Sequence, residues 1–297
     1  MLSEINKFIN LKNPLFRFFL FLLLFAGIST LDAFSGSIKT QEKILLFQNL
    51  FLCGMLGFIF YYVSRYLLKI QTVNPINVCV SSILIYLLVH PTNAPLMFIL
   101  VYIGMFLGKY FIKVSNLPIF NPAAIGLFIA LYFSKILFAF HLAPDTLLVS
   151  WWGADFQQQF LSQVPFLNIL CAATLLLGCV YFTKAFRKTS YAATFFLTYL
   201  LCNFIFNLVI SHQPAQTISI VFQSFFNSIA FLALIMIPEP KTSPALPTQQ
   251  IIVGLLAGAA LFLYSSIFVR FVEEPFITTI LTANLFTLYI KQKRLFQ

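Results

Sequence analysis

The chain has 297 residues, of which 60% are hydrophobic and only 9% are charged, and its mean hydropathy is +0.93. Such a composition excludes an ordinary soluble globular protein and is typical of an integral membrane protein. The lipid bilayer is therefore the first partner that the sequence predicts.

Apolar runs recur along the whole chain, many of them near the length of about 20 residues with which a helix crosses a bilayer. Ten runs are predicted as transmembrane helices, at residues 15–31, 44–63, 76–89, 95–112, 122–140, 164–183, 192–210, 216–237, 250–269 and 275–290. The third run is too short for a full crossing, so it is either extended by polar residues or interrupted within the membrane. The sequence thus predicts an all-α integral membrane protein, with residues 1–297 forming a single polytopic domain.

The basic residues predict how the chain is oriented. Ten spans place both termini on one side, and if that side is the cytoplasm it holds 14 of the 18 Lys and Arg residues. The opposite side then holds six of the eight acids. This is the bias that the positive-inside rule describes. The net charge of +10 is therefore explained by orientation, and no nucleic-acid partner is expected.

The cysteines and histidines predict no metal site. All five cysteines lie inside predicted spans, and the three histidines are scattered near span ends. Neither group has the spacing of a disulfide framework or of a protein-bound metal. We expect the cysteines to act as small apolar residues.

Two pairs of amide side chains lie at depth in neighbouring predicted spans. Asn203 and Asn207 are four residues apart, and Gln223 and Asn227 repeat that spacing. Each pair lies on one face of its helix. Two interpretations stay open: the amides bond across to another helix, or they line a ligand pocket.

The stretch NLPIFNPAAIG, residues 116–126, interrupts the apolar pattern with two prolines. Pro118 and Pro122 donate no backbone hydrogen bond, whereas Asn116 and Asn121 carry side chains that can bond open backbone groups. We predict a helix that starts at Asn121, with Pro122 in its first position. The positive end of that helix would suit a phosphate, a carboxylate or a flavin carbonyl.

A second proline-rich stretch, IMIPEPKTSP, covers residues 235–244 directly after an apolar run. It contains Glu239, Lys241 and Thr242. One interpretation is a cytoplasmic loop with a single solvated acid. The other is an irregular backbone that lines a site within the membrane.

Four stretches carry a family resemblance, in the same order along the chain as in the family: NVCVSSILIYLLVHP at 77–91, SNLPIFNPAAIGLFIALYF at 115–133, IMIPEPKTSPALPTQQIIVGLLAGAALFL at 235–263 and FITTILTANLFTLYI at 276–290. Together they resemble the NqrB/RnfD family, the membrane subunits of the sodium-pumping NADH:quinone reductase and of the Rnf electron-transport complex. The similarity covers about residues 74–297.

The resemblance implies about ten helices in two related halves with interrupted helices, in a bacterial inner membrane, and a flavin held near the outer surface. It places Asn121 and Glu239 in the conserved segments around the redox site, with Pro122, Lys241 and Thr242 as neighbours. No nicotinamide or iron-sulfur motif is present, so redox partner subunits are expected. The sequence predicts no catalytic residue of its own.

One departure from the family concerns the flavin anchor. Family members with covalent FMN attach it to the threonine of a serine-glycine-alanine-threonine motif, and the matching region here reads LVSWWGADFQQQF, residues 148–160. Gly153 remains, but Asp155 stands in place of the threonine. Because a carboxylate has no hydroxyl to esterify and would repel a phosphate, we expect FMN or riboflavin to bind without a covalent bond.

Trp151 and Trp152, the only tryptophans in the chain, precede that position. They are interpreted either as an interfacial aromatic belt or as a platform that stacks on the flavin ring.

Two functions are therefore predicted. The first is a membrane-embedded electron-transfer subunit with a non-covalent flavin. The second is a small-solute transporter or channel on the same scaffold, since interrupted helices near Pro75 and Pro118, and again at 238–247, are the pattern in which broken helices meet at a substrate site.

Overall fold

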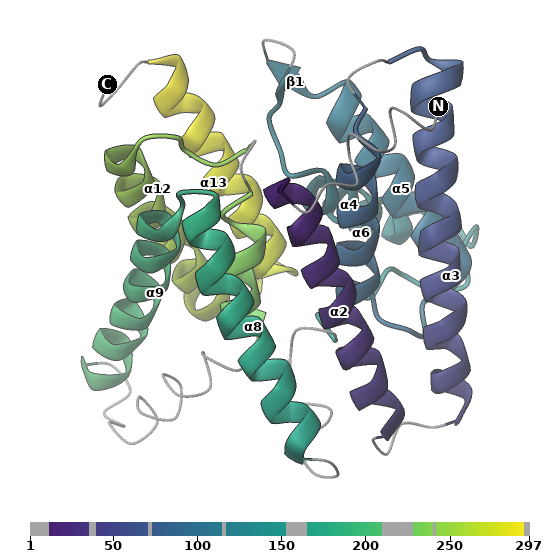
Figure 1. The fold of residues 1–297 in the computed structure, drawn as a ribbon, viewed down its shortest axis with the longest axis horizontal. Helices are drawn as coiled ribbons and strands as arrows, with labels where there is room; N and C mark the ends of the chain where they lie inside the picture. The colour runs from purple at the N-terminus through teal and green to yellow at the C-terminus, as the bar shows by residue number, and fades with distance from the viewer. Residues whose placement is uncertain are drawn as a thin grey trace. The chain divides into compact units, whose positions relative to one another are not determined.

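The computed structural model describes residues 12–35, 40–70, 73–114, 117–152, 165–209, 228–239 and 242–293, and almost all of its regular structure is helical (Figure 1). The helices are α2 (Pro14–Ser35), α3 (Thr40–Tyr62), α4 (Pro75–Leu88), α5 (Pro95–Tyr110), α6 (Pro122–Ala139), α8 (Pro165–Ala185), α9 (Thr189–Val209), α11 (Ser228–Phe231), α12 (Pro247–Phe262) and α13 (Pro275–Gln292). π-Helical turns continue α3, α11 and α12 as η1 (Val63–Leu67), η2 (Leu232–Met236) and η3 (Leu263–Ile267). A short antiparallel pair, β1 (Lys113–Val114) and β2 (Leu117–Pro118), joins α5 to α6.

The all-α expectation is confirmed, and five helical segments are long and apolar enough to cross a bilayer. They are Pro14–Leu31, Lys43–Leu67, Pro122–Ala139, Thr189–Val209 and Pro247–Ile267. α4 and α5 are apolar but shorter, in agreement with the prediction that the third run is short. The number of ten spans, their relation as two halves and the single domain over 1–297 stay predictions.

Proline marks the start of most of these helices. α2, α4, α5, α6, α8, α12 and α13 all begin at a proline. The first helical position needs no backbone N–H donor and suits the fixed φ of proline, so this residue stabilises a helix start rather than breaking the helix. At α4 the preceding residue completes the cap, because the Asn74 side chain accepts a hydrogen bond from the Ile76 amide at 2.9 Å.

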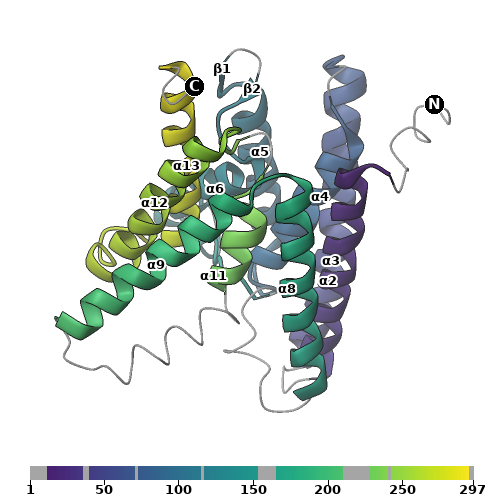
Figure 2. The same ribbon diagram turned by 60° about the vertical axis from the view of Figure 1, so that its left-hand side comes forward.

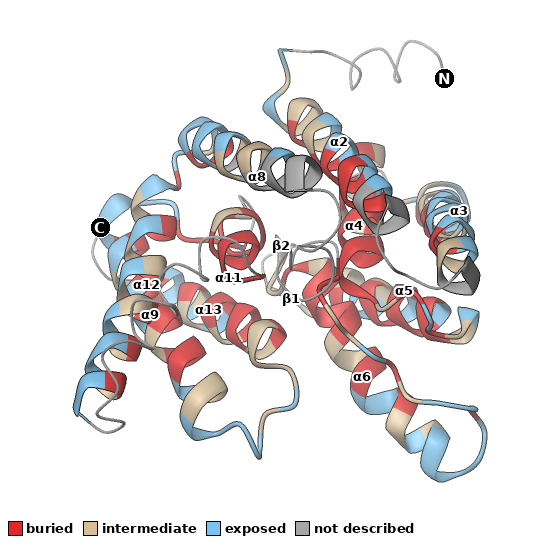
Figure 3. Ribbon diagram, turned by 90° about the horizontal axis from the view of Figure 1, so that it is seen from below, coloured by how far each residue is buried: buried red, intermediate tan, exposed pale blue. Residues whose placement is uncertain are grey.

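The chain divides into two compact units. Unit 1 comprises residues 1–107 and 126–178, and unit 2 comprises residues 108–125 and 179–297. In unit 1, α4 packs against both α2 and α3, and ten of its 14 residues are buried (Figure 3). α2 and α3 both carry large exposed apolar side chains, such as Leu24 of α2 and Phe51 of α3. This distribution is compatible with contact between these helices and lipid.

In unit 2, α12 packs along α9 and against α13 (Figure 2). Gly254 and Gly258 let the α9 and α12 backbones approach closely, since a Cβ atom at Gly258 would lie 2.5 Å from the Phe195 carbonyl oxygen. Small residues spaced four apart serve this purpose in membrane helices. The tight α9–α12 contact therefore depends on the absence of side chains at these two positions.

Candidate functional site

Asn121 caps α6, as the sequence predicts. Its side-chain Oδ1 accepts hydrogen bonds from the amides of Ala123 and Ala124, at 3.0 and 3.1 Å. Its backbone carbonyl accepts the next amide, that of Ile125, and Pro122 has no N–H to offer. The first-turn donors of α6 are thus satisfied by Asn121 itself, so the anion-binding potential expected of this helix end is already used.

A chain of hydrogen bonds links Asn121 to two distant segments of unit 2. The Asn121 amide donates to Asn284 Oδ1 at 2.9 Å, across 163 residues of sequence. Asn284 Nδ2 donates to the Thr242 carbonyl at 3.5 Å, and Thr242 Oγ1 donates to Glu239 Oε2 at 2.9 Å. Asn121, Asn284 and Thr242 are each at most 4% exposed, and we call these three residues with Glu239 the asparagine cluster.

The proline-rich stretch 235–244 is held in place where the structure describes it. Thr242, Ser243 and Pro244 are buried, and the Ser243 amide donates to the Glu239 carbonyl. Gln250 Nε2 reaches the carbonyls of Pro244, Ala245 and Arg187 from the first turn of α12. This geometry fits an irregular backbone that lines a site better than it fits a solvated loop.

Two lysines converge on the same stretch. Lys188 Nζ donates to the Pro244 carbonyl, and Lys291 Nζ donates to the Ser243 carbonyl at 3.3 Å. Burial disfavours the ammonium form of Lys188, and the nearby charge of Lys291 adds repulsion, so the pKa of Lys188 falls to about 8. Burial also lowers the pKa of Lys291. Neither lysine stands out in the sequence, because each bonds to a residue far along the chain. Pro244 is 56 residues from Lys188, and Ser243 is 48 residues from Lys291.

A pocket of about 240 Å³ opens beside the cluster in unit 2. The β1–β2 pair and α13 form its apolar wall. The buried part of its lining consists of Thr242, Asn284 and Thr287, and its exposed rim includes Lys291 and Gln292. The pocket thus combines hydroxyl and amide groups with a lysine.

The two tryptophans lie in unit 1 and are buried there. Trp152 is 1% exposed, its Nε1 donates to the Tyr86 carbonyl at 2.7 Å, and its ring meets the Tyr86 ring edge to face at 5.1 Å. Trp151 is 3% exposed, has a positive φ of 54°, and its amide donates to the Leu88 carbonyl. Rings packed in this way present no open face to a ligand, so a stacking role would require this segment to move.

Three predicted site residues, Gly153, Asp155 and Lys241, lie outside the described residues, as do Gln223 and Asn227. The other amide pair is described. Asn203 Nδ2 donates to the Tyr199 carbonyl and Asn207 Nδ2 to the Asn203 carbonyl, both at 2.9 Å. These bonds stay within α9, an arrangement that neither sequence interpretation anticipated.

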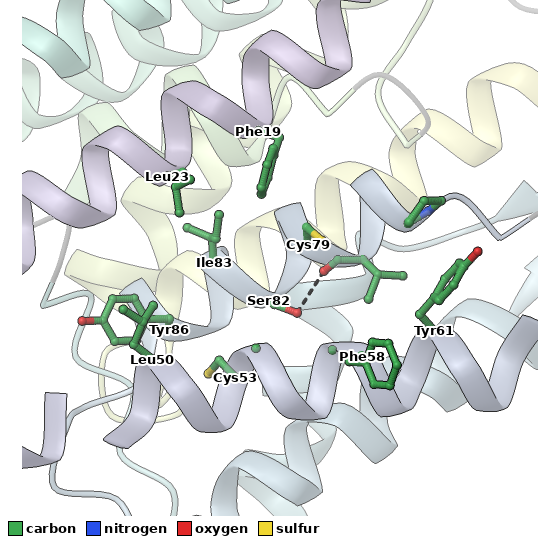
Figure 4. A pocket seen from close by; sticks show the side chains of 14 residues that line it. Phe19, Leu23, Leu50, Cys53, Phe58, Tyr61, Cys79, Ser82, Ile83 and Tyr86 are labelled. Carbon is green, nitrogen blue, oxygen red and sulfur yellow. Dashed lines mark hydrogen bonds between the residues drawn. The ribbon is translucent and has the colours of Figure 1, made fainter. Parts of the chain in front are cut away.

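Unit 1 holds a second cavity that sequence reasoning missed. It has a volume of about 390 Å³ and lies among α2, α3 and α4 (Figure 4). Its lining is almost wholly apolar, with Phe19 and Leu23 on one side and Phe58 on another. The hydroxyl of Ser82, its clearest polar group, bonds to the Val78 carbonyl of its own helix. No sequence motif predicts this cavity, because nearly all of its lining residues look like ordinary apolar residues of a helix.

Among the described residues, no group of three or more His, Cys, Asp or Glu side chains is placed to hold a metal ion. A scan against protein-family models finds no match for this chain, and a search among curated proteins finds no significant match either. The resemblance to the NqrB/RnfD family therefore depends on the four quoted stretches alone.

Proposed function

We propose that this protein is a multi-pass membrane subunit of an electron-transfer complex, similar to the NqrB/RnfD family, that binds a flavin without a covalent bond. The observation that carries the proposal is the asparagine cluster. Three of the four stretches that resemble the family, 115–133, 235–263 and 276–290, contribute to it through Asn121, Thr242 with Glu239, and Asn284. Stretches selected only by resemblance thus meet in one hydrogen-bonded network, as residues of a shared site would.

The residues of the cluster fit the hydrogen-bonding edge of a flavin ring. Asn284 Nδ2 makes one bond at the long limit of 3.5 Å, so its amide retains donor capacity for a ring carbonyl. Glu239, Thr242 and the neighbouring Lys241 would hold the same edge, while Asn121 and Pro122 fix the start of α6 beside them. When bound, the flavin supplies the redox chemistry, and the protein supplies its orientation and its electrostatic surroundings.

The same proposal includes ten membrane crossings in two related halves, with both termini in the cytoplasm of a bacterium and with redox partner subunits. Each unit supports the two-halves part of the proposal with one buried helical segment that ends before a proline. In unit 1, α4 ends at Leu88, shortly before Pro91. In unit 2, η2 ends at Met236, just before Pro238, and α11 and η2 are buried almost throughout.

The ending of a buried helical segment before a proline in each unit also favours the second candidate function, a small-solute transporter. Helices that stop inside the membrane and continue as irregular backbone are the usual walls of a transport site. On this alternative the asparagine cluster would bind the transported solute, and no flavin would be present.

The test is to purify the full chain in detergent, supply FMN or riboflavin, and precipitate the protein with acid. The proposal predicts flavin absorbance in the folded protein and flavin in the acid supernatant. Flavin that stays on the precipitated chain would contradict non-covalent binding. Protein that remains colourless after both flavins have been supplied would instead favour the transporter.

A pair of variants tests where the flavin binds. Thr242→Val removes the hydroxyl that donates to Glu239, so it is expected to lower flavin retention. Thr278→Val is the control, because that hydroxyl bonds only to the Glu274 carbonyl of its own helix. Equal retention in the two variants would remove the cluster from the proposed site.

A further inference from the structure

The pocket beside the asparagine cluster in unit 2 is small, and its lining combines apolar and polar residues. At about 240 Å³ it lies below the roughly 300–1,000 Å³ of sites that enclose a whole drug-sized ligand. Its walls are apolar at Val114, Leu117 and Leu288, yet Thr242, Asn284 and Thr287 give it a buried polar lining. The size suits a small polar headgroup with an apolar remainder, or one edge of a flavin ring.

The charges near this pocket are those of two lysines and of the Glu239 carboxylate, which accepts a hydrogen bond from the lining residue Thr242. Lys291 lies on the rim, and Lys188, which is only 5% exposed, is near enough for its pKa to respond to the charge of Lys291. Both ammonium groups donate to backbone carbonyls, and neither pairs with a carboxylate in the described part of the chain. Two cations held close together, neither of them paired with a carboxylate, attract an anion.

The β1–β2 wall of the pocket carries one more basic residue. Lys113, an exposed residue of β1, stands opposite Pro118 in the strand pair that forms the pocket wall, which adds a third basic residue nearby.

We infer that this pocket binds an anionic phosphate group, with Lys291 as its principal ligand. The pocket lies where the apolar run of α13 ends, so the phosphate of an anionic phospholipid can enter from the membrane surface while its acyl chains follow the apolar wall. A soluble phosphate offers the same chemistry. The inference requires neither a flavin nor electron transfer, although this pocket shares Asn284 and Thr242 with the proposed flavin site.

The test compares Lys291→Gln with Lys293→Gln in the delipidated full chain. Lys293 is exposed and lies two residues further along, and it lines no part of the pocket, so its variant removes the same charge from the same end of the chain. Native mass spectrometry measures the affinity for phosphatidylglycerol and for phosphatidylcholine, whose own cation the lysines would repel. A parallel arm titrates inorganic phosphate as a competitor.

Phosphatidylglycerol is expected to bind the wild type and Lys293→Gln alike, and to bind Lys291→Gln about fivefold more weakly. Competition by millimolar inorganic phosphate would assign the pocket to a soluble phosphate, and absence of competition would assign it to the lipid. Equal affinity in the two variants, or equal binding of the two lipids by the wild type, would overturn the inference. Circular dichroism checks that both variants keep the helical fold.

Discussion

Asn121 caps α6 with its side chain and donates its backbone amide to Asn284. One substitution removes the first interaction and leaves the second. Asn121→Ala removes the acceptor for two first-turn amides of α6, while its backbone amide still reaches Asn284. We expect it to lower the free energy of unfolding by about 1 kcal/mol, the usual cost of losing an N-cap. Thermal unfolding in detergent, followed by circular dichroism, measures the change.

Asn121→Ser is the matched control, because a serine hydroxyl also accepts the capping bonds. It should keep most of the stability that Asn121→Ala loses. If the two variants unfold at the same temperature, capping is not the role of the Asn121 side chain.

Lys188 makes stability depend on pH. Its pKa is about 8 in the folded chain against an ordinary value of 10.5, so between these values the unfolded chain holds a proton that the folded chain has released. The free energy of unfolding should therefore rise as the pH increases from 8 towards 10.5, by no more than about 3 kcal/mol. Below pH 8 Lys188 is charged in the folded chain as well, so the buried charge lowers the stability by its full amount.

The pH dependence of thermal unfolding in Lys188→Gln and Lys184→Gln checks this account. Lys184 is exposed in the last turn of α8, so its variant should keep the rise seen in the wild type. Lys188→Gln should lose most of it and keep the smaller rise that comes from Lys291, whose pKa burial also lowers. A rise of equal size in all three proteins would assign the effect to other groups.

The same residues show which parts of the site the sequence could predict. The cap at Asn121 and the proline at position 122 are local signals, because the bonds that explain them span two or three residues. Asn284 and Lys188 were missed, since their partners lie 163 and 56 residues away and no spacing rule connects them. Trp152 was predicted to lie at an interface or on a ligand, but its hydrogen bond to Tyr86 depends on packing within unit 1.

At the scale of elements, the α9–α12 contact depends on Gly258. A Cβ atom there would lie 2.5 Å from the Phe195 carbonyl oxygen and 2.9 Å from Thr198 Cβ, and backbone atoms cannot move aside easily. Gly258→Ala is therefore expected to lower the free energy of unfolding by about 1–3 kcal/mol through overpacking. Thermal unfolding is again the measurement.

Gly27→Ala supplies the control for this prediction. A Cβ atom at Gly27 in α2 meets nothing within 4 Å, so this variant gains the helix preference of alanine without a clash. It should be as stable as the wild type or slightly more stable. The prediction fails if Gly258→Ala is tolerated equally well.

Helix positions were largely predictable because apolar runs and prolines are both local. The predicted runs at 76–89 and 122–140 correspond to α4 and α6 within a few residues. The π-helical turns that end α3 and α12 left no sequence signal, since they depend on backbone hydrogen bonds rather than on residue type. Contact between α4 and both α2 and α3 was equally hidden, because all three helices are apolar around most of their circumference.

For the whole molecule, the charge distribution predicts the orientation. A reporter that fluoresces only in the cytoplasm should be active when fused to either terminus, because 14 of the 18 basic residues belong to that side in a ten-span arrangement. A phosphatase that is active only outside the cytoplasm should work when inserted near Asp145. Opposite signals from the two termini would rule out an even number of spans.

The function proposed for this membrane protein is to carry electrons on a flavin that it holds without a covalent bond. The most direct measurement is the visible absorbance of the purified, flavin-supplied protein before and after chemical reduction and after reoxidation by air. The account predicts a flavin band that bleaches on reduction and returns on reoxidation, with all of the flavin released by acid. A protein that shows no such band, with FMN or with riboflavin, would contradict it.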